Sequence, residues 1–328
     1  AGLPLTEPFY STYHNQAIAG AIITENPSIR NWFLNEGVIL SCDREFAVTD
    51  CTTPRIRIKN TSWDVCPYFT RVYHDLRYLG GYVDYLVFNL IDDGYYVCFG
   101  GVDDYYIKGK TFYGERHFDH DGMICGYDRR DKTFTVYAYD ENWLLKKFKT
   151  PRDSFRRAVK SMQSRWNHGY IEGVKPKKET VEFSPKRALE NIREYLDSSL
   201  EKYPANTEAP AYGIVVMDYA AKYVDKLFSE SIPYDRTDRR FMRVIWEHKR
   251  GMCERIALIE KAFGMDSFLS DKYNGLVENA NRLRLLFAAH CLKRRTSLLP
   301  IIRDGLCEIK AAEKLILEIL LYQTDGKI

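Results

Sequence analysis

The chain lacks several patterns that would assign it to a class at once. Its eight cysteines include no Cys-x-x-Cys pair, which argues against a structural zinc site and against a disulfide scaffold in 328 residues. No run approaches about 18 consecutive apolar residues, so we expect no membrane-spanning helix. A net charge of +3 is too small to indicate a nucleic-acid partner.

Further missing patterns concern the compartment of the protein and its bound groups. The opening Ala1-Gly2-Leu3-Pro4 has no basic segment followed by an apolar core, so we expect no secretory signal. Scattered thiols without a pairing pattern predict reduced cysteines and a cytoplasmic protein. The helical patterns carry no Glu-x-x-His motif on paired helices. We therefore predict no metal and no cofactor bound by the protein itself.

Residues 1–160 mix two periodicities. A run of small and apolar residues at 15–25 predicts a tightly packed central helix, and apolar spacing at 67–78 predicts a second one. The segment 82–90 fits either a helix or a strand. Helices followed by a sheet predict an α+β domain. From residue 94 the sequence is rich in Tyr, Val, Phe and Ile, which predicts strands at 95–102, 105–108, 123–127 and 133–139.

The rest of the chain predicts helices. Residues 161–182 are polar and basic and are interpreted as a linker after a first domain at 1–160. Phe183-Ser184-Pro185 then predicts a helix start, with serine as the N-cap and proline at the first helical position. We expect residues 183–328 to form an all-α bundle. Apolar residues at helical spacing predict its further helices at 213–228, 238–263, 269–293 and 298–322.

A histidine and an aspartate mark the clearest candidate site. His120 opens an apolar run that ends in Gly126-Tyr127-Asp128, and the alternating strand that follows ends at Asp140. A hairpin of these two strands can bring His120 close to Asp140. A carboxylate beside an imidazole fixes its tautomer and stabilises the imidazolium, as in a nucleophile–His–Asp triad. We therefore predict a hydrogen bond between the two side chains; the alternative is a surface hairpin that carries both by chance.

This pattern resembles the papain-like fold of bacteriocin-leader peptidases, and within that group the butirosin-biosynthesis H-type acyltransferases of peptide-antibiotic pathways. Further segments that carry the resemblance are Leu3-Pro4-Leu5, Cys66-Pro67-Tyr68-Phe69 and residues 94–107. It covers about residues 3–160. The resemblance implies a central helix packed on an antiparallel sheet, followed by a helical domain.

The nucleophile that this pattern requires is missing from its expected place. In the papain-like fold it begins the central helix, but residues 11–17 contain no cysteine. A helix N-terminus favours a thiolate, so a thiol is sought at a helix start. Four interpretations are open: a cysteine replaced by Ala17, Cys66 before a later helix, a hydroxyl nucleophile at Ser11 or Thr12, and a site that binds without catalysis.

Polar residues around these positions are candidates for binding. Asn15 and Gln16 could donate to an oxyanion or cap the central helix. His14 could line the site or cap the same helix. Asp103, followed by Asp104, could bind a substrate amine or belong to an ordinary turn.

The resemblance implies an acyltransferase that forms an amide. It would take an acyl group from the phosphopantetheine thioester of an acyl or peptidyl carrier protein and pass it to a small-molecule amine, as in nonribosomal peptide or polythioamide antibiotic biosynthesis. Carrier proteins are acidic, so Lys146, Lys147, Arg152 and Arg156 are candidate docking residues, with a solvated linker as the alternative. Two other functions are open: a catalytically inactive papain-like scaffold protein and a cysteine peptidase.

Overall fold

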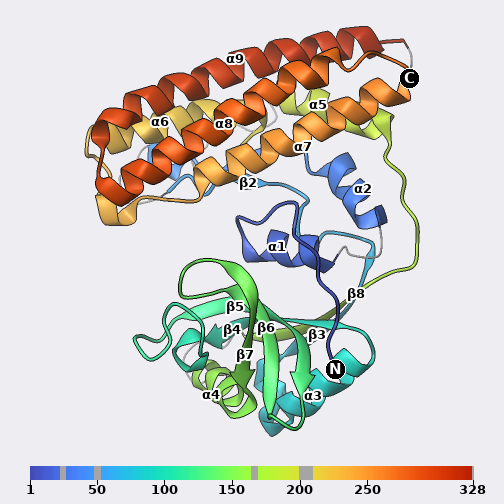
Figure 1. Ribbon diagram of the computed structural model, residues 1–328, viewed down its shortest axis with the longest axis vertical. Helices are drawn as coiled ribbons and strands as arrows, with labels where there is room; N and C mark the ends of the chain where they lie inside the picture. Colours follow the sequence, from blue (N-terminus) through green and yellow to red (C-terminus); the bar gives the residue numbers. More distant parts are fainter. Residues whose placement is uncertain (23–26, 48–52, 164–168, 199–209, 327–328) are drawn as a thin grey trace. The chain divides into compact units, whose positions relative to one another are not determined.

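The computed structural model describes residues 1–22, 27–47, 53–163, 169–198 and 210–326. The chain divides into two compact units (Figure 1). Unit 1 contains Ala1–Arg30 and Ser62–Thr180, and unit 2 contains Asn31–Thr61 and Val181–Ile328. These units differ from the predicted domains, because residues 31–61 belong with the helical half and residues 161–180 belong with the sheet.

Unit 1 is built on a six-stranded antiparallel sheet with the strand order β3-β8-β4-β5-β6-β7 (Figure 1). The predicted hairpin is present, since β5 pairs with β6 and places Tyr127 opposite Phe134. The α+β expectation is thereby confirmed. The strands are β3 (Phe69–Asp75), β4 (Tyr96–Asp103), β5 (Asp119–Asp128), β6 (Thr133–Tyr139), β7 (Leu145–Pro151) and β8 (Tyr170–Pro176).

Several segments of unit 1 differ from the sequence-based expectation. The strand predicted at 105–108 is wrong, because Asp104–Tyr106 form a short 3-10 helix. The helix predicted at 67–78 is wrong, because β3 occupies most of it and pairs along its whole length with β8. The linker predicted at 161–182 contains β8, an interior strand whose Ile171 and Val174 are fully buried. Each strand gains its backbone partners from the other, so pairing over a long sequence separation outweighs the local pattern.

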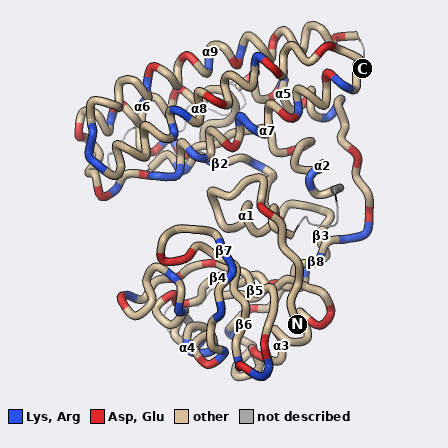
Figure 2. The backbone as a smooth tube through the Cα atoms, in the orientation of Figure 1, with Lys and Arg blue, Asp and Glu red and all other residues tan. Residues whose placement is uncertain are grey.

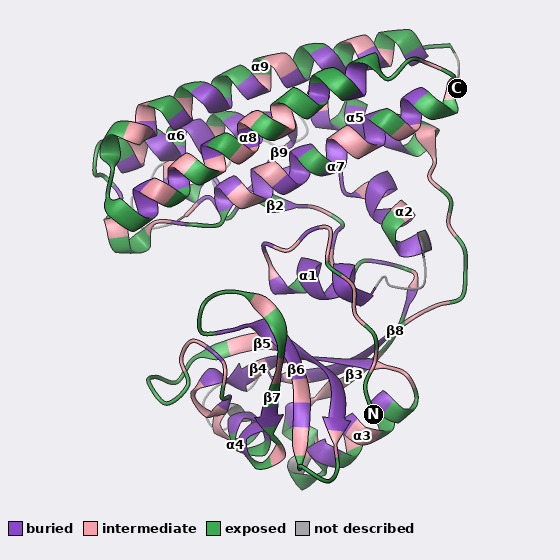
Figure 3. Cartoon of the chain, in the orientation of Figure 1, coloured by how far each residue is buried: buried purple, intermediate pink, exposed green. Residues whose placement is uncertain are grey.

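Helices pack against the six-stranded sheet of unit 1, and buried side chains fill the contact between them (Figure 3). α3 (Val83–Asp92) and α4 (Arg152–Gln163) contribute Val87 and Phe155 to a buried cluster with Phe99 of β4. The segment 82–90 is therefore helical. α1 (His14–Ala21) packs against β5 and β6, so the first part of the helix predicted at 15–25 is present, and residues 23–25 lie outside the described residues.

Unit 2 is mainly helical. Its three-stranded sheet has the order β2-β1-β9, formed by β1 (Leu40–Cys42), β2 (Arg57–Ile58) and β9 (Ala211–Tyr212). The expected helix start is confirmed, since Ser184 Oγ accepts a hydrogen bond from the Arg187 N–H at 3.2 Å. None of the described helices combines the length and apolar character needed to cross a membrane. The helices are α2 (Pro27–Glu36, in unit 2 from Asn31), α5 (Pro185–Asp197), α6 (Val216–Phe228), α7 (Phe241–Ala262), α8 (Phe268–Lys293) and α9 (Leu299–Thr324).

The bundle of unit 2 contains a buried charged cluster. Lys249 Nζ lies 2.6 Å from Oε2 of Glu313, and both side chains are fully buried. Tyr195 and Tyr273 donate their hydroxyls to the same carboxylate. The charge of each ion is thus balanced and every oxygen of Glu313 is hydrogen-bonded, which is what makes burial of such a pair tolerable.

Candidate functional site

His120 lies at the beginning of β5, and two buried residues hold one side of its ring. Its Nδ1 is 2.9 Å from Oδ2 of Asp104 and 3.1 Å from Nζ of Lys110. The side chains of Asp104 and Lys110 are 2% and 1% exposed, against 22% for His120. Among the described residues none forms a hydrogen bond with His120 Nε2. An ionised carboxylate only accepts, so the hydrogen bond to Asp104 places the hydrogen on Nδ1 and the Lys110 ammonium is then a close neighbour of Nδ1 without a hydrogen bond to it. This tautomer leaves Nε2 free to accept a proton.

Lys110 completes this cluster. Its Nζ donates to the carbonyl oxygen of Asp121 at 3.1 Å and lies 3.5 Å from Oδ1 of Asp104. Burial lowers the pKa of Lys110, and the negative charge of Asp104 acts in the opposite direction. The two oxygens of the Asp104 carboxylate therefore serve different partners, one the ammonium group of Lys110 and the other the ring of His120.

Strand pairing explains how Asp104 reaches His120. β4 pairs with β5 so that Val102 lies opposite His120, and the register shifts between Phe99 and Val102. Asp104 follows β4 directly, in a short 3-10 helix, and its backbone N–H donates to the carbonyl oxygen of Phe118 at 2.9 Å. Such a shift re-aims side chains at the end of a strand. The carboxylate that contacts His120 therefore comes from the 3-10 helix directly after β4, the strand that pairs with β5.

The predicted hydrogen bond between His120 and Asp140 is not formed. The carboxylate of Asp140 instead accepts from the backbone N–H groups of Asn142 and Leu144, at 2.9 and 2.8 Å, and forms an ion pair with Lys146. Burial raises the pKa of Asp140, but these partners outweigh burial and lower it below the ordinary value. Asp140 therefore stabilises the turn after β6 and does not orient His120.

A second histidine–aspartate pair lies beside the first. His117 Nδ1 is 2.7 Å from Oδ2 of Asp103, and the ring of Tyr105 stacks on His117 with centroids 4.5 Å apart. Asp103 is fully buried and also accepts from the hydroxyl of Ser161 and from two backbone N–H groups. Its oxygens are occupied, so the expected role of Asp103 in binding a substrate amine is not supported. Adjacent aspartates followed by His-x-x-His are the sequence signal for this double arrangement.

His14 joins the site from α1. Its ring meets that of His120 edge to face, with centroids 4.7 Å apart, and the backbone N–H of Tyr139 donates to His14 Nε2 at 3.2 Å. Burial, and then the charges of Lys110 and His120, lower the pKa of His14 well below its ordinary value. His14 is therefore a neutral imidazole within the site.

The hydrogen bonds of His120 include none to a candidate nucleophile within the described residues. Among the described residues no cysteine thiol, serine hydroxyl or threonine hydroxyl forms a hydrogen bond with His120, and Ser11 and Thr12 precede α1. Ala17 is fully buried in α1 and lies three residues after His14, on the same side of the helix. Asn15 is exposed, and its Oδ1 accepts from the backbone N–H of Gln16, which is buried.

Cys66 is not a low-pKa thiol. It precedes β3 instead of a helix, so no helix N-terminus lies behind it. Burial raises the pKa of Cys66 to about 12. The proposed second nucleophile is therefore wrong on both of the properties that suggested it. Cys51 lies outside the described residues.

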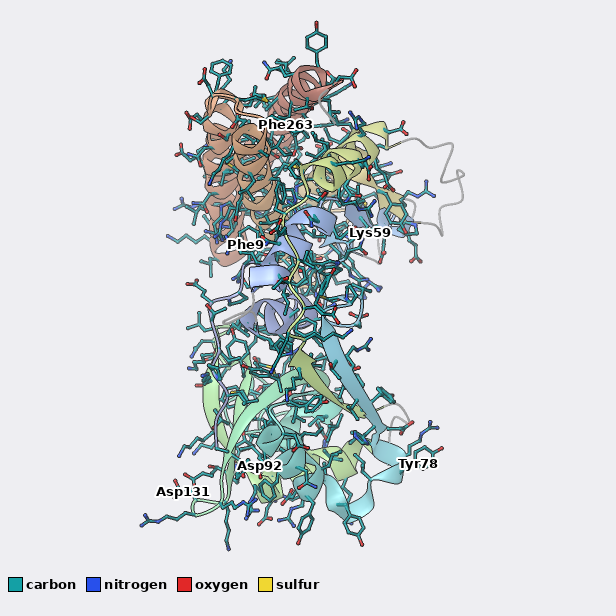
Figure 4. All side chains as sticks on the ribbon, turned by 90° about the vertical axis from the view of Figure 1, so that its right-hand side faces the viewer. Phe9, Lys59, Tyr78, Asp92, Asp131 and Phe263 are labelled. Atoms are coloured by element: carbon teal, nitrogen blue, oxygen red, sulfur yellow. The ribbon has the colours of Figure 1, made fainter. Side chains whose placement is uncertain are left out.

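Most of the candidate docking residues already have acidic partners within unit 1. Figure 2 marks the Lys and Arg positions and the Asp and Glu positions along the backbone. Lys146 pairs with Asp140, and Arg152 and Arg156 lie 3.9 and 3.2 Å from Asp84. Lys147 has no ion pair within the described part of the chain. The charge that remains for an acidic carrier is smaller than the sequence suggested. Similar pairing holds at the β5–β6 turn, where Lys149 lies 3.3 Å from Asp131, which Figure 4 labels.

Within the described ranges, no group of three or more His, Cys, Asp or Glu side chains is placed to hold a metal ion. Comparison of the chain with protein-family models and with curated protein sequences finds no match.

Proposed function

We propose that this chain transfers an acyl group from a thioester to an amine, with His120 as the general base. The single observation that carries the proposal is the His120–Asp104 pair, with Nδ1 held by a buried carboxylate and Nε2 unoccupied. The family resemblance supports the substrate class, a thioester on the phosphopantetheine arm of a carrier protein. It also supports a papain-like arrangement of unit 1, in which α1 packs on β5 and β6.

The reaction balances without a nucleophile from the protein. The amine nitrogen attacks the thioester carbonyl carbon, and a C–N bond forms while the C–S bond breaks. His120 Nε2 takes the proton that the amine loses and passes it to the leaving thiolate, so the products are an amide and a free thiol. Asp104 stabilises the imidazolium that forms between these steps, as a buried carboxylate does in a triad.

Direct transfer departs from the acyl-enzyme mechanism that the resemblance implies. A covalent intermediate needs a thiolate or alkoxide beside the base. The partners of His120 are Asp104 and Lys110, and neither is placed as a nucleophile, since one carries the orienting hydrogen bond and the other is buried in an ion pair with it. The base therefore acts on the incoming amine.

The test uses synthetic N-acetylcysteamine thioesters with a panel of primary amines and amino acids. Thiol release is followed by a colorimetric thiol reagent and the amide by mass spectrometry. We expect amine-dependent thiol release with an equal amount of amide, and a loss of about 10²–10⁴-fold in His120→Gln. His74→Gln, a histidine change on β3, is the matched control and should keep full turnover. Release that does not depend on amine, or that survives in His120→Gln, contradicts the proposal.

A second candidate function is a binding protein of the same kind of pathway. The absence of a thiol or hydroxyl bonded to His120 within the described residues favours it. Calorimetry with a pantetheine thioester distinguishes the two. Saturable binding without thiol release in the presence of every amine would support the binding protein.

A further inference from the structure

The tautomer of His14 is fixed by a backbone group. The N–H of Tyr139 donates to His14 Nε2 at 3.2 Å, so this nitrogen must carry a lone pair. A neutral ring then bears its hydrogen on Nδ1. Within the described residues, none accepts a hydrogen bond from His14 Nδ1. The hydrogen on His14 Nδ1 is thus available to an acceptor from outside the described chain.

The surroundings keep this ring neutral. Lys110 brings a positive charge to the same cluster, and protonation of His120 during the reaction would add a second. Two positive neighbours and burial lower the pKa of His14, and protonation would also remove the acceptor for the Tyr139 N–H. A neutral imidazole beside a base can donate a hydrogen bond throughout the reaction without losing its proton to solvent.

His14 lies next to the proposed general base, His120. Its ring lies edge to face with that of His120, with centroids 4.7 Å apart, at the first residue of α1. In the proposed reaction the amine loses its proton to His120 Nε2, so the thioester carbonyl would react beside this pair of rings. The N-terminus of α1 adds a partial positive charge there.

We propose that His14 is an electrophilic catalytic residue, whose Nδ1–H donates a hydrogen bond to the thioester carbonyl oxygen as negative charge builds on it. This inference rests on the proposed acyl transfer and assigns the oxyanion donor for it. Asn15, one of the two donors expected from the sequence, is exposed, and its Oδ1 accepts from the Gln16 N–H. The donor comes from an imidazole.

Two substitutions test the acceptor at Nε2 and the donor at Nδ1 separately. In His14→Gln the side-chain amide reaches the position of Nε2, so the acceptor for the Tyr139 N–H is kept and the Nδ1 donor is lost. In His14→Asn the amide reaches the position of Nδ1, so the donor is kept and the acceptor is lost. The proposal predicts that His14→Gln lowers kcat by about 10²–10³-fold with little change in KM, whereas His14→Asn keeps kcat within about tenfold of the native chain. A purely structural role predicts the reverse order, so an equal or reversed order overturns the proposal.

A measurement without turnover tests the same ring. Long-range ¹H–¹⁵N spectra of the uniformly labelled chain should show one histidine with hydrogen on Nδ1 that does not titrate between pH 5 and 8, and His14→Asn should remove this signal. Hydrogen on Nε2, or titration near the ordinary value of about 6.5, would overturn the assignment. If the native chain forms no amide, the acyl-transfer proposal fails whatever the spectrum shows. If it forms amide and His14→Gln is equally fast, only the role of His14 fails.

Discussion

Replacement of Asp104 by asparagine tests whether Asp104 or Asp140 is the carboxylate that orients the ring of His120. The Nδ1–Oδ2 distance of 2.9 Å joins His120 to a carboxylate that is 2% exposed. A hydrogen bond to a charged group contributes about 1.5–3 kcal/mol, and an asparagine N–H placed against Nδ1 would also invert the tautomer. We expect the turnover of thioester with amine to fall by about 10²–10⁴-fold, which corresponds to about 3–5 kcal/mol of transition-state stabilisation.

The same change should destabilise unit 1, because Lys110 would lose the partner that lies 3.5 Å away. Removal of one member of a buried pair costs about 3–5 kcal/mol. Urea unfolding measures this loss, and turnover is measured at a urea concentration and temperature where the variant remains folded. The double variant Asp104→Asn/Lys110→Met removes the unpaired charge, so it should recover part of the stability and none of the turnover.

Asp140→Asn is the comparison that can refute this reasoning. Asp140 contacts Lys146 and two backbone N–H groups, so its replacement should reduce stability and leave turnover within about threefold of the native chain. If Asp140→Asn loses turnover and Asp104→Asn keeps it, the sequence-based triad is right and the assignment of Asp104 is wrong.

Three further outcomes follow from the buried groups. Glu313→Ala should lower the free energy of unfolding by about 3–5 kcal/mol in urea, because Lys249 loses its counter-ion, whereas a loss below about 1 kcal/mol would contradict the role of the pair. Burial lowers the pKa of His248 below its ordinary value, so below about pH 6.5 the unfolded chain binds a proton that the folded chain does not. The free energy of unfolding should therefore fall as the pH decreases below about 6.5, by up to about 1.4 kcal/mol per pH unit. His248→Gln should reduce that slope. Burial raises the pKa of Cys66 to about 12, so iodoacetamide at neutral pH should label the exposed Cys307 and leave Cys66 unmodified, as peptide mapping can show.

The helical half was predicted well because its information is local. Apolar residues at helical spacing continue through α7, α8 and α9, and Ser184 before Pro185 marks the start of α5. Each of these signals concerns neighbours within a few turns, where spacing determines which face is buried. The β5–β6 hairpin was predicted for the same reason.

Features that depend on distant partners were missed. Phe69–Asp75 was expected to be helical, but its partner is β8, about a hundred residues later in the chain. The sequence predicts Asp140 as the partner of His120 instead of Asp104, because it shows the hairpin and does not show the pairing of β4 with β5 or its register shift. A local pattern shows where a carboxylate can lie and does not show which of two nearby carboxylates faces the histidine.

The most direct test of the account is whether the acyl group ever becomes bound to the protein. The chain carrying Cys307→Ser, which removes an exposed thiol, is incubated with the N-acetylcysteamine thioester without amine, quenched in acid at times from milliseconds to minutes, and weighed intact. Direct transfer with His120 as base predicts an unchanged protein mass at every time, followed by amide formation when amine is added. A mass increase equal to the acyl group, formed at the rate of turnover and lost on addition of amine, would show an acyl-enzyme and contradict the account.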